Sequence, residues 1–247
     1  MLNQALAICE AESIQGLGKA DYQDLGGVLN DTAVCQAQLG EWKGAEIHLK
    51  RALYMGERAQ SPDVLLMVAT HTNLGEVYGQ MGALGKAEAH LRQATTWLSK
   101  QVAKGKENAS YCIDRATLAA VHGSLGRVRL LQGHEQDAVH LLQDAVSLSE
   151  RSIRHPVYGK SLSNLALFHL QQHNGSIAEK LLRLARTALK RTVGIKHLDM
   201  VICLNNLACV APLSEVTHFK KPELIVVQPV EVFLGGWIIF SMPAHFS

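Results

Sequence analysis

A pattern of alanine and leucine recurs four times in this chain of 247 residues. In each copy, a short polar turn is followed by alanine, by leucine four positions later and by alanine three positions after that. The copies are Ala45-Leu49-Ala52, Ala87-Leu91-Ala94, Ala138-Leu142-Ala145 and Ala178-Leu182-Ala185, and their first alanines lie 42, 51 and 40 residues apart. Residues three and four apart share one face of a helix. Each copy therefore predicts a helix whose alanines allow a second helix to approach closely.

A second predicted helix precedes each of these copies. It is apolar and contains a small residue at a fixed position: Ala33, Gly75, Gly126 and Ala166, with Ala208 in a fifth, incomplete copy. Gly40, Gly82 and Gly133 stand in the first three turns, where glycine can end a helix in the left-handed conformation at little cost. The fourth turn reads His173-Asn174-Gly175. Each unit is thus a predicted helix–turn–helix hairpin.

These motifs resemble the tetratricopeptide repeat, in which Leu-Gly-x2-Tyr, here ending at Tyr78, precedes the alanine pattern. The linker GIKHLD at residues 194–199, followed by LNNLA at residues 204–208, is similar to that of the longer repeats of the kinesin light chain and nephrocystin class. The resemblance implies an all-α fold, a right-handed α-solenoid of stacked hairpins. Two departures stand out. Gln36, Arg129 and His169 replace the tyrosine, and His71 and His122 replace a large apolar residue, which predicts looser packing at that edge.

We expect three segments along the chain. Residues 1–20 have the pattern of a second helix from a partial repeat, residues 21–210 form an array of about four full repeats plus the first helix of a fifth, and residues 211–247 are a non-repeat apolar tail. The insertion at residues 100–115 predicts a longer helix followed by an exposed loop. In the tail, the uncharged residues 232–244 are too few to span a bilayer, which needs about 20 residues. This argues against a membrane anchor, although a membrane-tethered adaptor stays an alternative.

The sequence offers no pattern for catalysis or metal binding. Its twelve histidines and five cysteines include no His-Glu-x2-His motif and no Cys-x2-Cys spacing, and no phosphate-binding loop or Gly-x-Ser-x-Gly motif occurs. A formal net charge of +2 leaves no general basic field for nucleic acid. We therefore expect a non-enzymatic, cytoplasmic chain with reduced thiols, without metal, cofactor or nucleic-acid partner. Nothing in the sequence indicates an oligomeric state.

The expected binding surface is the concave groove, which the first helices line in tetratricopeptide arrays. Paired small or polar residues recur there, and asparagine can both donate and accept hydrogen bonds to the backbone of a bound peptide. Glu76, Arg127 and Lys160 would add side-chain selectivity. The predicted groove residues are Asn30, Asp31, Thr72, Asn73, Glu76, Ser124, Arg127, Lys160, Ser163, Asn164, Asn205 and Asn206. The alternative is that these residues only solvate the groove wall.

Three acid–base pairs, Glu46–Lys50, Glu88–Arg92 and Glu179–Arg183, are four residues apart on the second helices, where they predict a solvated outer surface. The favoured function is a protein-interaction scaffold or adaptor that binds a protein or peptide ligand, or a helix, in the groove. The resemblance implies roles in cargo adaptation or cytoskeletal and ciliary assembly. A regulatory signalling module within a larger assembly is the alternative.

Overall fold

The computed structural model describes residues 21–59, 61–105 and 115–210. Every regular element in these ranges is helical: α2 (Asp21–Gln38), α3 (Trp42–Arg58), α4 (Val64–Gln80), α5 (Leu84–Gly105), α6 (Arg115–Leu131), α7 (Glu135–Ser149), the 3-10 turn η1 (Glu150–Ser152), α8 (Pro156–Gln171), α9 (Gly175–Thr192) and α10 (Leu198–Ala208). The predicted all-α repeat solenoid is confirmed. The predicted partial repeat at residues 1–20, the loop at 106–114 and the tail at 211–247 lie outside the described residues.

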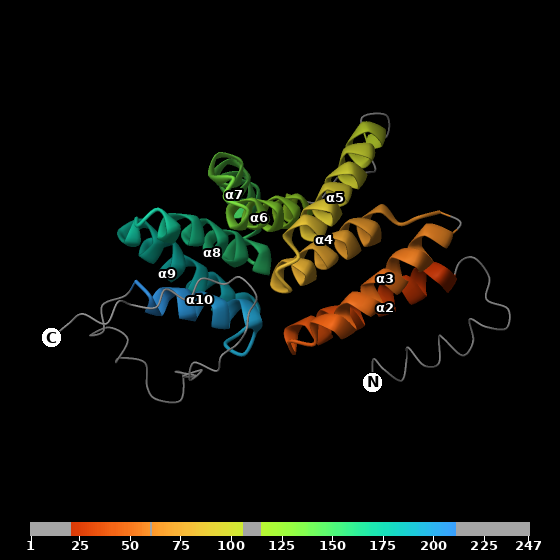
Figure 1. Ribbon diagram of the computed structural model, residues 1–247, viewed down its shortest axis with the longest axis horizontal. Helices are drawn as coiled ribbons and strands as arrows, with labels where there is room; N and C mark the ends of the chain where they lie inside the picture. The colour runs from red at the N-terminus through yellow and green to blue at the C-terminus, as the bar shows by residue number, and fades with distance from the viewer. Residues whose placement is uncertain (1–20, 60, 106–114, 211–247) are drawn as a thin grey trace.

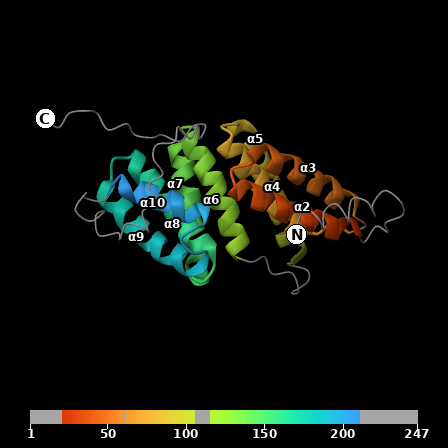
Figure 2. The same cartoon turned by 90° about the horizontal axis from the view of Figure 1, so that it is seen from below.

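The helices pair as antiparallel hairpins that follow one another along an arc. The hairpins are α2–α3, α4–α5, α6–α7 and α8–α9, and α10 packs on α9 as the first helix of the next unit (Figure 1). Seen from below, they stack side by side along the long axis (Figure 2). The arc leaves α2, α4, α6, α8 and α10 around one hollow, and we call these five the inner helices and their partners the outer helices.

The same turn closes all four hairpins. The left-handed residue is Gly40, Gly82 or Gly133, with φ between 74° and 82°, but in the fourth turn it is His173 at 57°. Gly175 instead begins α9. In each turn, the next residue donates its amide to the carbonyl five positions back, as in Ala83 to Tyr78 at 2.9 Å. This hydrogen bond is typical of the Schellman motif, and all four turns lie where the sequence predicted them.

Related linkers at residues 61–64, 155–157 and 194–199 precede α4, α8 and α10 and cap these inner helices. The carboxylate of Asp63 accepts the Leu65 amide at 2.8 Å at the start of α4. His155 and His197 do the same for α8 and α10 through Nδ1, which accepts an amide two residues on at 3.3 Å and 3.2 Å. The resemblance of these linkers therefore has a physical basis, because each supplies an acceptor for the otherwise unpaired amides of a helix start.

The small residues mark the places where two helices touch. All eight alanines of the repeated pattern are at most 1% exposed, and so are its four leucines. Opposite them, a Cβ atom built on Gly75 would lie only 2.5 Å from Cγ of Leu91, and one built on Gly126 would lie 2.9 Å from Cγ of Leu142. The inner helix therefore needs a small residue at this position, because the leucine of the outer helix fills the space beside it.

Replacing Gly75 by alanine is expected to lower the free energy of unfolding by about 1–2 kcal/mol, because the added methyl group overpacks a filled core. Gly27→Ala on α2 is the control, since its Cβ would meet nothing within 4 Å. That change should raise stability by about 0.5–1 kcal/mol. Denaturant unfolding of both variants measures the difference, and a stabilising effect at both sites would contradict this packing.

Two of the three acid–base pairs are more than a solvated surface, because their acids also contact the next repeat, which corrects the sequence-based interpretation. The Glu46 side chain is only 19% exposed, because it also accepts a hydrogen bond at 2.8 Å from the Tyr78 hydroxyl of the next hairpin. At the equivalent position of the next repeat, Glu88 forms an ion pair with Arg129 at 3.1 Å. Arginine therefore takes over the role of the missing tyrosine and joins successive repeats. In the following unit, Val139 occupies the acidic position, and Nδ1 of His169 is buried with no hydrogen-bond partner among the described residues.

The position of His71 is also packed rather than loose. His71 is 8% exposed, and its Nδ1 lies 3.1 Å from Nδ1 of His90 on α5. The ring of Tyr78 stacks on His90 with centroids 5.5 Å apart. Burial, and in the second place the neighbouring His90, lower the pKa of His71 to about 4. The pair is therefore neutral at pH 7, and one ring donates to the other.

Candidate functional site

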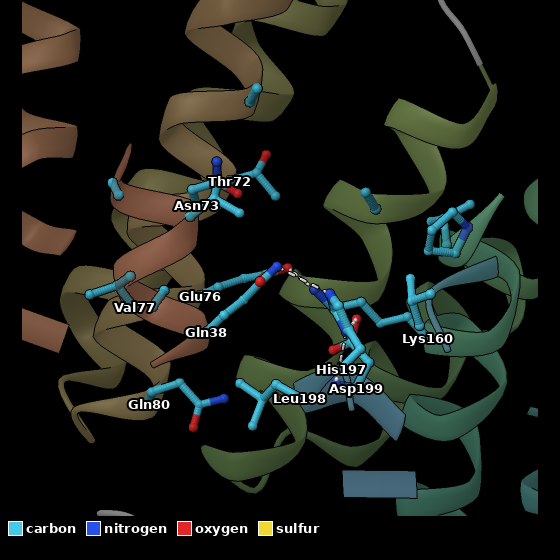
Figure 3. Close-up of a pocket in the computed structure, with 18 of the residues that line it drawn as sticks. Gln38, Thr72, Asn73, Glu76, Val77, Gln80, Lys160, His197, Leu198 and Asp199 are labelled. Carbon is cyan, nitrogen blue, oxygen red and sulfur yellow. Dashed lines mark hydrogen bonds and ion pairs between the residues drawn. The ribbon is translucent and has the colours of Figure 1, made fainter. Parts of the chain in front are cut away.

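The hollow between the inner helices encloses a cavity of about 410 Å³ (Figure 3). This volume lies within the usual range for ligand pockets, about 300–1,000 Å³. All five inner helices contribute lining residues, and most of those residues are apolar. Among them are Val34 and Ala37 of α2, Val77 of α4, Ala116 and Ala120 of α6, Val157 of α8, and Leu198 and Ile202 of α10.

The lining follows one face of each inner helix. On α4 it includes Ala69, Asn73, Glu76 and Gln80, which are spaced four, three and four residues apart. That spacing keeps all four side chains on one helical face. The corresponding positions on the other helices include Ala120, Arg127, Lys160 and Ile202. We call this set the inner stripe.

Five of the predicted groove residues line the cavity: Thr72, Asn73, Glu76, Arg127 and Lys160. Ser163, Asn164 and Asn206 line a small cavity of about 20 Å³, which shares Arg127 and Lys160 with the larger one. Asn30, Asp31, Ser124 and Asn205 line neither of these two cavities. Asp31 and Asn205 are exposed, whereas Asn30 and Ser124 are buried.

The asparagine row connects neighbouring inner helices. Asn73 donates to Oδ1 of Asn30 at 3.0 Å, which joins α4 to α2. Asn164 donates to the carbonyl of Gly123 at 3.2 Å, which joins α8 to α6. Part of the hydrogen-bonding capacity assigned to a peptide backbone is thus used between repeats. The peptide-binding role of this row stays a prediction.

An ion pair crosses the hollow from α8 to α4. Nζ of Lys160 lies 2.6 Å from Oε1 of Glu76, which also accepts the Ser124 hydroxyl of α6 at 2.7 Å. Burial opposes the charge on Glu76, but Lys160 and then Arg127 outweigh it and lower its pKa to about 2. Burial likewise opposes the charge on Lys160, but Glu76 and Asp199 raise its pKa above the ordinary value. Both groups are therefore charged at neutral pH.

Replacing Lys160 by methionine is expected to cost about 1–2 kcal/mol of unfolding free energy. The change leaves the Glu76 carboxylate inside the hollow without its closest cation. The loss should be smaller than for a fully buried pair, because both side chains are 25% exposed and Ser124 still donates to Glu76. Lys50→Met is the control, since Lys50 is 56% exposed in its pair with Glu46. Equal losses in thermal or denaturant unfolding would contradict a special role for the pair across the hollow.

The two ends of the described array meet at the rim of the cavity. Nε2 of Gln38, at the end of α2, lies 3.1 Å from Nε2 of His197, the residue that caps α10. Figure 3 shows Gln38 and Glu76 extending from one side of the cavity toward His197 and Lys160 on the other. This contact between the end of α2 and the start of α10 narrows the opening of the cavity on that side.

The sequence-based site omitted the apolar part of the lining. Val34, Ala120 and Ile202 were not predicted, nor was Asp199, which faces the same cavity. A signal was present: a step of four residues back from Asn73 leads to Ala69, and a step of four residues forward from Glu76 leads to Gln80. The prediction relied on the pairs of small or polar residues, but Thr72-Asn73 is the one predicted pair that lines the larger cavity.

The described residues contain no group of three or more histidine, cysteine or acidic side chains placed to hold a metal ion. None of the helices in the same part of the chain is both long and apolar enough to cross a bilayer. The tail, on which the alternative of a membrane tether rests, is outside those residues.

Comparison with known families and structures agrees with this architecture. The tetratricopeptide repeat family matches residues 24–96 and again residues 160–199. The fold is similar to the crystal structure of BtubC (BKLC) from P. vanneervenii, with a TM-score of 0.59, 14% identity and coverage of 85% of this chain and 80% of that one. The segments matched by the family are tetratricopeptide repeats.

Two further similarities concern parts of other proteins. Nearly identical repeats of a putative kinesin light chain from Podosopora anserina are 18% identical, with a TM-score of 0.49 and coverage of 79% of this chain and 87% of that one. A clustered mitochondria protein homolog of Aspergillus clavatus is 29% identical over 133 residues, or 53% of this chain. The chain spans only 10% of the length of that relative.

Proposed function

We propose that this chain is a protein-interaction scaffold that binds an extended peptide or a helix in the cavity between its inner helices. The observation that carries the proposal is the cavity lining, which is mostly apolar but contains a cluster of opposite charges. Solenoid arrays use extended concave surfaces of this kind for binding. The repeat family and the resemblance of the linkers support the same role.

The lining suggests how a ligand would be held. The alanines of the inner stripe, such as Ala69 and Ala120, leave room for the side chains of a ligand, and burial of apolar area would supply most of the affinity. The centre contains Arg127 and Lys160 beside Glu76 and Asp199, so its formal charges balance. Such a centre favours ligands with one or two charges at defined positions over strongly acidic or basic segments.

The proposal is tested by selecting ligands from a displayed library of random peptides on the full chain. Ala69→Arg, which places a long cation in the cavity, is expected to weaken the affinity of a selected peptide at least 10-fold. Ala89→Arg is the matched control, because Ala89 is exposed on the outer helix α5. Peptides that bind both variants equally well would show that the cavity is not the binding site.

Two broader assignments are proposals of the same kind. A role as one module of a larger assembly is supported by the small share of the curated relative that this chain covers. Adaptor work in the cytoplasm, next to the cytoskeleton, is supported by the linker motifs at residues 155–157 and 194–199. Fractionation of the native cell, followed by identification of the proteins that bind the cavity specifically, tests both.

A further inference from the structure

The last inner helix, α10, begins at the cavity and ends outside its lining. Leu198 and Ile202 in the first half of α10 line the cavity, and α10 ends at Ala208. Residues 211–247 follow. From residue 224 onward this segment contains Glu231 as its only charged side chain, together with Phe233, Trp237 and Phe240. A long apolar segment is therefore tethered next to a largely apolar cavity.

We propose that the part of the segment 224–247 around Phe233 and Trp237 occupies the cavity as an internal ligand. The inference rests on the proposed function, because it assigns an occupant to the same site. The tether is long enough. A helix the length of α10 spans about 16 Å, whereas residues 211–223 can extend on the order of 40 Å. The segment can thus return along α10 to Ile202 and beyond.

Tethering makes even a weak interaction effective. A tether of this length gives an effective concentration on the order of 1 mM. At that concentration, a segment with an intrinsic dissociation constant of about 0.1 mM would fill roughly nine cavities in ten. The apolar lining around Val34, Ala120 and Ile202 fits the aromatic and branched side chains of the segment. Glu231 supplies one acid for the centre that contains Arg127 and Lys160.

The expected consequence is competition with external ligands. A peptide that binds the cavity must first displace the segment, so its apparent affinity falls by the fraction of chains in which the cavity is open. With nine cavities in ten filled, the loss is about 10-fold. The tail would then restrict binding to partners of high affinity or high local concentration.

The decisive experiment places a photoreactive benzoylphenylalanine at position 237 of the full chain. Irradiation of the dilute protein is expected to give cross-links within one chain to peptides of α4, α6 or α10 that contain inner-stripe residues. Ala69→Arg should remove these cross-links, and Ala89→Arg should leave them unchanged. Cross-links confined to outer helices, cross-links between two chains, or no cross-links would each overturn the inference.

A second readout separates this inference from the proposed function. The variant Phe233→Asp/Trp237→Asp is expected to bind a library-selected peptide about 10-fold more tightly than the unchanged chain. Equal affinity, together with cross-links that miss the inner stripe, would end the inference while the groove function stands. If Ala69→Arg leaves peptide affinity unchanged both in the natural chain and in the Phe233→Asp/Trp237→Asp variant, the proposed groove function is refuted, whatever the cross-links show.

Discussion

Replacing Leu182 by alanine is expected to lower the free energy of unfolding by about 3 kcal/mol, within the range of about 2–5 kcal/mol for such changes. Leu182 is fully buried at 0% exposure and packs with Leu162 of α8 and Met200 of α10 in one core cluster. The substitution would therefore leave a cavity where three successive inner and outer helices meet. Because each repeat is stable only against its neighbours, the loss should extend to the whole array.

Leu184→Ala is the matched control, on the same helix two residues away. Leu184 is 54% exposed, so its truncation should change stability by no more than about 0.5 kcal/mol. Urea denaturation followed by circular dichroism measures both variants. Similar losses for the two leucines would contradict the assignment of the repeated leucine to the stacking core.

Lowering the pH from 7 toward 4 is expected to remove up to about 3 kcal/mol of stability through His71. Burial, with His90 in second place, lowers the pKa of His71 from 6.5 to about 4. Between these two values the unfolded chain binds more protons than the folded one. Stability from this group is therefore fully present above pH 6.5 and is lost as the pH falls to about 4.

His71→Leu isolates this effect. Leucine already stands at the equivalent positions 29 and 162, so the helix accommodates it there. We expect a smaller difference in unfolding free energy between pH 7 and pH 4.5 for this variant than for the unchanged chain. The comparison is needed because burial also lowers the pKa of His90, His122 and His169, and these groups act in the same direction. An unchanged pH dependence in His71→Leu would refute the histidine pair as its source.

The fold was predictable because its information is local. Each hairpin repeats the same register of small residue, turn and alanine–leucine pattern, so an error in one unit is corrected by the others. The tyrosine position illustrates the limit. Arg129 could be recognised as a departure, but its ion pair with Glu88 of the preceding repeat required the placement of two helices.

The site was only partly predictable because it depends on the accumulated curvature of the array. Glu76 and Lys160 are 84 residues apart in sequence and separated by a whole hairpin, yet their charged groups lie 2.6 Å apart. Gln38 and His197 meet across 159 residues. No pattern within a single repeat encodes how far the arc closes. Most polar members of the inner stripe were visible in the sequence, whereas its alanines could be found only through their helical spacing from these polar residues.

The central claim, that the cavity between the inner helices binds the ligand, is tested most directly by the alanine methyl groups. A chain labelled with ¹³C only at alanine methyls is titrated with a library-selected peptide, and its methyl NMR spectrum is recorded. We expect the signals of Ala69 and Ala120 in the cavity to shift, and the signal of Ala89 on the outer face of α5 to remain in place. A shift of Ala89 with unmoved signals from Ala69 and Ala120 would contradict the account.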